Sequence, residues 1–161
     1  MSDPIWIKHA KTFIGLKEGS GAADNPKVVA FYSKAGHPEV KHDSVPWCAA
    51  FVGGVLADKG IKPTGTLWAL DYAKYGTKLS KPAVGAIATK KRKGGGHVFF
   101  VVGWDATHVW GLGGNQGDKV CIVSYPRSII YSYNWPPGAT QPDYKDQGFK
   151  AARSSGPISE A

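Results

Sequence analysis

Cys48 lies in the segment Pro46-Trp47-Cys48-Ala49-Ala50-Phe51-Val52, where a loop is predicted to lead into an apolar helix. Cysteine attacks a carbonyl carbon as the thiolate, so a catalytic cysteine needs a lowered pKa. The free backbone N–H groups in the first turn of a helix stabilise an anion, including the oxyanion of a tetrahedral intermediate. The position favours a nucleophile, and packing as a small buried core residue is the alternative.

His97 is the histidine best placed to accept the thiol proton. It follows the glycines Gly94-Gly95-Gly96 and opens an apolar segment that is expected to form a central strand. A histidine at the mouth of such a strand can present its ring to a helix N-terminus, which is what a Cys–His pair requires. A position in a surface loop is the alternative for a lone histidine before a strand.

Asn115 is expected to hold the His97 imidazole in one tautomer, as the third member of a triad does. It lies one hairpin after His97, and its amide oxygen can accept the ring proton. The alternative is that Gly113-Gly114-Asn115 only forms a turn. Asp118 and His108 are rivals for the role, but Asp118 is expected beyond the turn and His108 at the opposite end of its strand.

The elements that must position these residues divide the chain into a helical half and a half of strands. Apolar residues recur at helical spacing, with glycine stops, in residues 4–14, 26–35, 47–59 and 67–75. Residues typical of strands, separated by turn sequences, occur at 86–89, 97–104, 108–112, 120–125 and 129–135. Helices followed by a meander of strands predict an α+β domain with an antiparallel sheet.

Several segments together resemble, in order and spacing, the motif blocks of a family of small phage and bacterial proteins. They are residues 46–52, 96–103 (Gly-His-Val-Phe-Phe-Val-Val-Gly) and 113–116 (Gly-Gly-Asn-Gln), with Gly15-Leu16-Lys17-Glu18 and Asn25-Pro26 similar to its N-terminal block. That family belongs to the CHAP and NlpC group of papain-like cysteine amidases and endopeptidases that act on peptidoglycan. The resemblance covers about residues 5 to 135.

The resemblance implies a papain-like fold of the CHAP/NlpC type, with N-terminal helices packed on a central antiparallel β-sheet. It implies a peptidoglycan hydrolase that cuts an amide or peptide bond through Cys48, His97 and Asn115, without a cofactor. The third position varies in this group among His, Glu, Asp and Asn. Some relatives bind calcium through clustered acidic residues, whereas Glu18 and Asp24 are isolated here, so no metal is expected.

Trp47, Gln116 and Glu18 are candidates for contact with the substrate. Trp47 adjoins the nucleophile and is expected either to line the cleft or to anchor the core. Gln116 is placed to donate to the oxyanion or the substrate, or to point into solvent from its hairpin. Glu18 belongs to the N-terminal block and is expected to touch substrate or to brace the site. Cys121, within a strand, is expected to serve in packing.

The net charge of +8 favours an anionic partner, which nucleic acid, an anionic membrane or a cell wall would satisfy. The chain has no helix-turn-helix or zinc-finger pattern, and its basic residues form one short cluster, so no nucleic acid is expected. That cluster is Lys90, Lys91, Arg92 and Lys93. We expect it to hold the protein on an anionic wall or outer-membrane surface, with a solvated hairpin tip as the alternative.

The 161 residues are expected to form one domain, with 1–135 as the hydrolase and 136–161 as an irregular Pro- and Gly-rich tail of it. The N-terminus lacks a basic segment followed by an apolar run, so we expect synthesis in the cytoplasm without a signal peptide. We also expect the protein to be a monomer. Action in the periplasm or on the wall then needs release or injection.

A phage endolysin, which lyses the cell wall, fits these expectations best. An injected interbacterial amidase toxin would use the same chemistry, and a non-catalytic wall-binding or virion module is a further alternative. The presence of both Cys48 and His97 argues against that last alternative. The triad chemistry does not distinguish a muramyl–alanine amidase from an endopeptidase.

Overall fold

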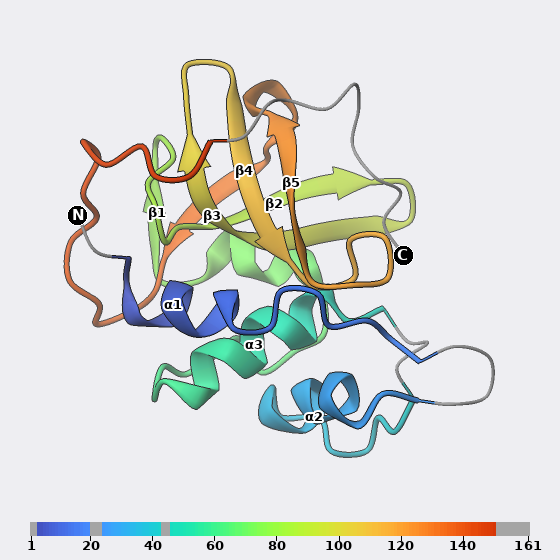
Figure 1. Cartoon of the computed structure of the whole chain (residues 1–161). Helices are drawn as coiled ribbons and strands as arrows, with labels where there is room; N and C mark the ends of the chain where they lie inside the picture. The colour runs from blue at the N-terminus through green and yellow to red at the C-terminus, as the bar shows by residue number, and fades with distance from the viewer. Residues whose placement is uncertain (1–2, 20–23, 43–45, 151–161) are drawn as a thin grey trace.

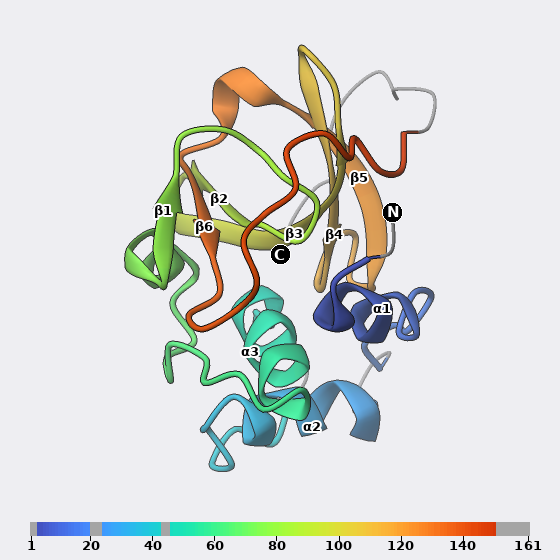
Figure 2. The ribbon, with the colours of Figure 1, turned by 90° about the vertical axis from the view of Figure 1, so that its left-hand side faces the viewer.

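The computed structural model of the chain describes residues 3–19, 24–42 and 46–150. One antiparallel sheet lies above a group of helices, and α3 lies between the sheet and α2 (Figures 1 and 2). The helices are α1 (Ile5–Lys11), α2 (Pro26–Lys34) and α3 (Cys48–Asp58), with 3-10 turns η1 (Ala69–Lys74) and η2 (Arg127–Ile129). None of the helices in these ranges has the length and apolar character needed to cross a bilayer.

Six strands make up the sheet, in the spatial order β1-β6-β2-β3-β4-β5, and every neighbouring pair is antiparallel. They are β1 (Thr77–Leu79), β2 (Ile87–Arg92), β3 (Gly95–Trp104), β4 (His108–Gly113), β5 (Cys121–Pro126) and β6 (Ser132–Trp135). The chain forms a meander from β2 to β5, and β6 then returns to pair with β2. The predicted α+β class with an antiparallel sheet is confirmed.

Element boundaries differ from the predictions where local turns intervene. The first helix ends at Lys11 rather than near residue 14, and the fourth helical segment is the 3-10 turn η1. The last strand begins at Ser132, because Arg127–Ile129 form η2. The three-residue β1 is not predicted, since it depends on pairing with the distant β6 rather than on a pattern of its own.

The sequence of α3 is apolar around the whole helix because the sheet covers one of its faces and α2 covers another. Phe51 packs edge-on against Phe100 of β3 and Phe31 of α2, with ring centroids 6.1 and 5.2 Å apart. Gly54 lets α2 approach closely, since a Cβ there would lie 3.0 Å from the Phe31 ring. These contacts fix α3 against the sheet and therefore fix the position of its first residue, Cys48.

The segment after β6 crosses the sheet as an irregular strap as far as residue 150 (Figure 2, orange to red). The Phe149 N–H donates to Val102 O, and the Trp104 N–H donates to Gln147 O, both at 2.9 Å. Gly103 is required at this crossing, because a Cβ there would lie 1.5 Å from Phe149 O. The part of the expected tail from 151 to 161 lies outside the described residues.

Asp58, at the C-terminal end of α3, connects all three helices. Its carboxylate accepts hydrogen bonds from His9 Nε2 of α1 at 2.7 Å and Lys34 Nζ of α2 at 3.1 Å. Partial burial acts to raise the pKa of Asp58, but the hydrogen bonds and charges of His9 and Lys34 outweigh it and hold this pKa below its usual value.

We therefore expect Asp58→Asn to lower the free energy of unfolding by about 1 kcal/mol at neutral pH, because it breaks the partly exposed ion pair with Lys34 and the hydrogen bond from His9. Because the folded-state pKa is lowered, this contribution is complete above the ordinary aspartate pKa of about 4 and is lost as the pH falls further. Urea titrations of both proteins from pH 7 downward measure the difference. Glu39→Gln, which breaks an exposed pair with His37, is the control. If the difference in the free energy of unfolding between the two proteins stayed the same in acid, the ionised Asp58 carboxylate would not be its source.

Candidate active site

Cys48 is the first residue of α3, and its side chain is 5% exposed. The residue before it, Trp47, fixes the start of the helix. The Trp47 indole is fully buried, stacks on Phe31 with 6.3 Å between ring centroids, and donates its Nε1–H to Glu18 Oε1 at 3.0 Å. The sulfur of Cys48 is thus held at the N-terminus of an eleven-residue helix, where the helix dipole favours a negative charge.

The thiol of Cys48 is hydrogen-bonded to the imidazole of His97, as the sequence predicts for a nucleophile and its base. The backbone N–H of Val98 also donates to the sulfur, and the positive charge of Arg92 acts on it. Burial by itself would raise the pKa of Cys48. The His97 hydrogen bond and charge, with the contributions of Val98 and Arg92, outweigh burial, so that the pKa of Cys48 is below its ordinary value.

Gln116 fixes the orientation of the His97 ring. His97 Nε2 lies 2.9 Å from Gln116 Oε1, and both groups are buried. The amide of Gln116 is oriented by its own contacts, because its Nε2 donates to Cys121 O at 2.7 Å and to Gly111 O at 3.2 Å. Its Oε1 also accepts the hydroxyl proton of Tyr125 at 2.9 Å.

This arrangement determines where the neutral imidazole carries its proton. A carbonyl oxygen only accepts, so His97 Nε2 is the donor to Gln116. The remaining nitrogen, Nδ1, then has a lone pair and can accept the proton of Cys48. The tautomer that a thiol–imidazole pair needs is therefore set by Gln116 through the same device that a third triad residue provides.

The prediction that Asn115 orients His97 is corrected by this geometry. Asn115 has a φ of +62°, in the left-handed region, and the following residue brings its side chain to the ring. Neither amide atom of Asn115 has a hydrogen-bond partner among the described residues, although its side chain is only 1% exposed. Asn115 and Gln116 both carry an amide oxygen that can accept the His97 ring proton, so residue type alone could not show which of them does so.

Direct contact with substrate, predicted for Trp47 and Gln116, is also corrected. Both side chains are fully buried and offer no surface to a substrate. Glu18 is half-buried and holds the Trp47 indole, which is the bracing role that was the alternative for it. The segment around Glu18 is tied to the turn after β4, since the Glu18 N–H donates to Asp118 O at 3.0 Å.

The side chains of the basic run 90–93 do not all lie on one face, because successive residues of a strand point to opposite sides of the sheet. Lys90 is directly opposite His97 in the sheet, is buried, and places its Nζ 5.6 Å from the ring centroid of Tyr125. Arg92 is half-buried and close enough for its charge to act on Cys48. The exposed Lys91 instead lies over the ring of Tyr131, at 4.3 Å. Two of the four cations therefore belong to the site rather than to a solvated hairpin tip.

Sequence reasoning misses two aromatic residues of this region. Tyr125 belongs to the network that fixes Gln116, and only its place on β5, beside the hairpin, reveals this. Trp68 is 53% exposed and lies beside Gly95, with a ring atom 3.7 Å from the position of a Cβ there. An exposed indole thus borders the glycines that precede His97, although its spacing in the sequence is typical of a helix that packs on a core.

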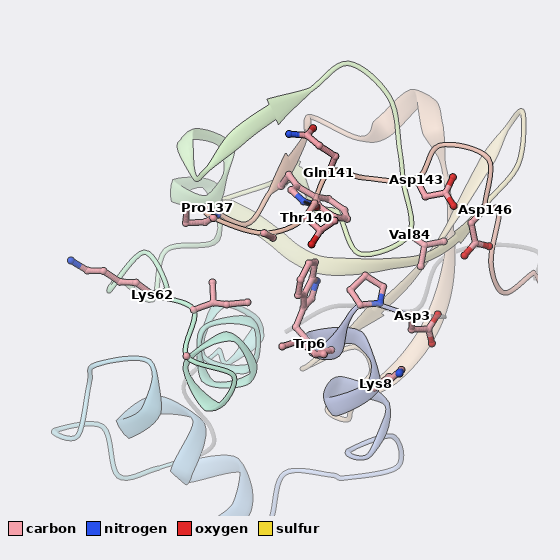
Figure 3. A pocket seen from close by; sticks show the side chains of 17 residues that line it. Asp3, Trp6, Lys8, Lys62, Val84, Pro137, Thr140, Gln141, Asp143 and Asp146 are labelled. Atoms are coloured by element: carbon pink, nitrogen blue, oxygen red, sulfur yellow. Dashed lines mark hydrogen bonds between the residues drawn. The ribbon is translucent and has the colours of Figure 1, made fainter. Parts of the chain in front are cut away.

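The described part of the chain also has a pocket of about 900 Å³, whose lining residues Figure 3 shows. It lies between the start of α1, the chain that follows α3, and the strap after β6. Trp6, Ile61, Lys62, Trp135, Pro137, Asp143 and Asp146 are among the residues that line it. An eleven-residue helix spans about 16 Å, and Cys48 is at the other end of α3. The pocket therefore does not include the Cys48–His97 pair.

Comparisons of the chain with protein-family models, with curated protein sequences and with solved structures find no match. Within residues 3–19, 24–42 and 46–150, no group of three or more His, Cys, Asp or Glu side chains is placed to bind a metal ion. What the site can do follows from the Cys48–His97–Gln116 geometry, which is that of a nucleophile, a base and an orienting acceptor.

The two cysteines should differ in the pH dependence of their alkylation. We expect Cys48 to react with iodoacetamide with a midpoint below the ordinary thiol pKa of about 8.5, and Cys121, whose pKa is raised by burial, to react with a higher midpoint. His97→Ala should move the Cys48 midpoint upward and leave that of Cys121 in place. Peptide mass spectrometry of timed reactions resolves both sites. Equal midpoints in the wild-type protein would contradict an activated Cys48.

Gln116→Leu should slow alkylation of Cys48 at neutral pH by on the order of tenfold, because His97 loses the acceptor that fixes its tautomer. The variant also removes the hydrogen bonds that the Gln116 side chain makes with two backbone carbonyls and with the Tyr125 hydroxyl, which should cost about 1–3 kcal/mol of stability. Tyr125→Phe is the control, because it retains the contact between Gln116 and His97. A folded Gln116→Leu protein with unchanged Cys48 reactivity would show that Gln116 is not the orienting residue.

Proposed function

We propose that the protein is a cysteine hydrolase of the papain-like type, with Cys48, His97 and Gln116 as its triad. The observation that carries this proposal is the buried chain of contacts from the thiol at the start of α3, through the imidazole, to the fixed oxygen of Gln116. A cysteine that serves only in packing needs none of these partners. The lowered pKa of Cys48, caused by His97 against the effect of burial, supports a reactive thiolate.

The chemistry follows the roles of the three side chains. His97 Nδ1 takes the proton of Cys48, and the thiolate sulfur forms a bond to the carbonyl carbon of the substrate, giving a tetrahedral oxyanion. The oxyanion collapses, the C–N bond breaks, and His97 returns the proton to the leaving amine. A water molecule then loses a proton to His97 and attacks the thioester, releasing a carboxylic acid and the Cys48 thiol. Gln116 keeps Nε2 as the protonated nitrogen throughout.

We propose peptidoglycan as the substrate, with the bond cut being either the muramyl–alanine amide or a peptide bond of the stem or cross-link. The resemblance of the motif blocks to the CHAP and NlpC group supports this class. The surface around the site also suits it, because Arg92 supplies positive charge beside the thiol and the exposed Trp68 supplies an apolar wall. Stem peptides carry carboxylates, and aromatic side chains are suited to contact with sugars and peptides.

An endolysin that reaches the wall after release from the cytoplasm is the biological role that this proposal favours. An injected amidase toxin would use the same three residues in the same way. In both roles the protein would act alone on an insoluble anionic polymer. The net charge of +8 and the exposed Lys91 and Lys93 would favour its accumulation there at low ionic strength.

Incubation of purified protein with peptidoglycan from several bacteria, followed by mass spectrometry of the soluble products, tests the proposal. We expect wild-type protein to release fragments, and both Cys48→Ala and His97→Ala to lower the rate by about 10³-fold or more. His108→Gln, which removes a histidine at the far end of β4, should retain full activity. The product masses identify the bond. Inert wild-type protein on all walls, or an active Cys48→Ala variant, would overturn the proposal.

A further inference from the structure

Three consecutive glycines lie at the hairpin between β2 and β3, and the fold accounts for only two of them. Gly94 has a φ of +81°, which the turn requires. A Cβ at Gly96 would lie 2.5 Å from the Leu70 side chain, so packing requires that glycine. Gly95 is not in the left-handed region, and among the described residues a Cβ there would meet only the Trp68 ring, at an ordinary 3.7 Å. A strand glycine without a structural reason often marks a place that a ligand approaches closely.

The space beside Gly95 lies on the face of the sheet that carries His97. In the pairing of β2 with β3, Gly95 is opposite Arg92 and His97 is opposite Lys90. Paired residues share a face, as does every second residue along a strand, so Arg92 points to the same side of the sheet as His97. Two residues of strand, about 7 Å, separate the two pairs. The positive charge of Arg92 acts on Cys48, which agrees with this placement.

Among the four cations of the basic run, Arg92 is the one that faces the site and also reaches the surface. Lys90 shares its face but is buried. Lys91 points to the opposite face, where its Nζ lies 4.3 Å from the ring centroid of Tyr131. Lys93 lies in the turn, since β2 ends at Arg92. The half-buried Arg92 is therefore held by its surroundings and is still accessible to a substrate.

We propose that Arg92, Gly95 and Trp68 form a subsite that binds a carboxylate of the substrate close to the bond that Cys48 attacks. The proposal rests on the function proposed above and specifies which substrates the site selects. The guanidinium of Arg92 can donate two parallel hydrogen bonds to a carboxylate. Trp68, which is 53% exposed, would cover the apolar part of the same substrate residue, and the missing side chain of Gly95 leaves space beside the indole. Stem peptides with a free carboxylate near the scissile bond are then preferred to stems in which that carboxylate is amidated.

Two alkylating reagents separate this role of Arg92 from a role in stabilising the thiolate alone. Iodoacetate and iodoacetamide react with Cys48 in the same way, with a sulfur–carbon bond forming as iodide leaves, and they have nearly the same shape. Only iodoacetate carries a carboxylate. The ratio of the two rates at neutral pH therefore measures binding of the carboxylate and does not depend on the fraction of Cys48 that is ionised. N-acetylcysteinamide, a small uncharged thiol, provides the reference ratio.

In the wild-type protein, we expect the ratio of the iodoacetate rate to the iodoacetamide rate at Cys48 to exceed the reference by on the order of tenfold. Arg92→Gln should bring it to within about twofold of the reference. Lys91→Gln, the same change of charge on the opposite face, should keep the wild-type ratio. A wild-type ratio no higher than the reference would overturn the inference. An equal fall of both rates in Arg92→Gln would also overturn it, because Arg92 would then act on the thiol alone.

Gly95→Ala tests the subsite without removing a charge. The added methyl group fills the space beside Trp68 at an ordinary contact distance, so thermal unfolding should occur at or above the wild-type temperature. We expect the variant to release peptidoglycan fragments on the order of tenfold more slowly than the wild-type protein. Release at the wild-type rate would show that no part of the substrate lies over Gly95, and the subsite would be refuted.

Failure of this inference and failure of the proposed function give different results. Wild-type protein that prefers iodoacetate through Arg92 but releases nothing from peptidoglycan would refute the peptidoglycan proposal and retain the carboxylate subsite. Wild-type protein that cuts stems with free and with amidated carboxylates equally fast would refute the subsite and leave the proposed function in place.

Discussion

The site depends on one buried hydrogen bond, between Gln116 Oε1 and His97 Nε2, and much of the surrounding sheet serves to make that bond possible. An amide in a protein interior is stabilising only when its donors and acceptor are all used. Gln116 meets this condition with two backbone carbonyls, the Tyr125 hydroxyl and the imidazole. Because the two carbonyls accept from the Gln116 amide nitrogen, the Gln116 oxygen must point toward His97. It therefore places the imidazole proton on His97 Nε2, although Gln116 itself carries no charge.

The hairpin of β4 and β5 is shaped around this network. A Cβ at Gly113 would lie 2.8 Å from Gln116 Oε1, and a Cβ at Gly111 would lie 2.4 Å from the Phe99 ring. Glycine at these two positions leaves the space that the Gln116 side chain and the Phe99 ring occupy. Gly114 then lets the same hairpin reach the first turn of α3. These three glycines thus let the turn after β4 pack closely against both β3 and the start of α3.

The contact between Cys48 and His97 was predictable because each residue has a local signal, and the rest of the site was not. Cys48 precedes an apolar run long enough to be a helix, and His97 begins a run of β-branched and aromatic residues. The choice between Asn115 and Gln116 depends on the backbone of Asn115, since a left-handed residue redirects the side chain that follows it. Trp47 was ambiguous because burial of one indole is decided by residues far away, here Glu18 and Phe31.

The same distinction applies to the fold. Helix and strand types follow from periodicity, whereas the return of β6 to β2, and the pairing of β1 with it, join segments that share no local pattern. The strap after β6 is irregular by composition, but its path depends on two glycines that pair where it crosses β3, since Gly103 admits Phe149 O and Gly148 lies against Val102 O. Long-range pairings of this kind are set by which strand edges remain open after the meander forms, and a sequence pattern does not contain that information.

The contrast between the two cysteines shows why the environment of the thiol, rather than its presence, carries the functional argument. Burial acts to raise the pKa of both thiols, because an ion removed from water loses several kcal/mol of solvation. For Cys48 the His97 hydrogen bond and charge reverse the effect, with help from Val98 and Arg92. For Cys121 the contacts with Gln116 and Lys119 do not, and the thiol donates its proton to Gln116 O at 3.3 Å. One sulfur is therefore prepared to act as an anion, and the other remains a neutral donor that helps to hold the turn on which the first depends.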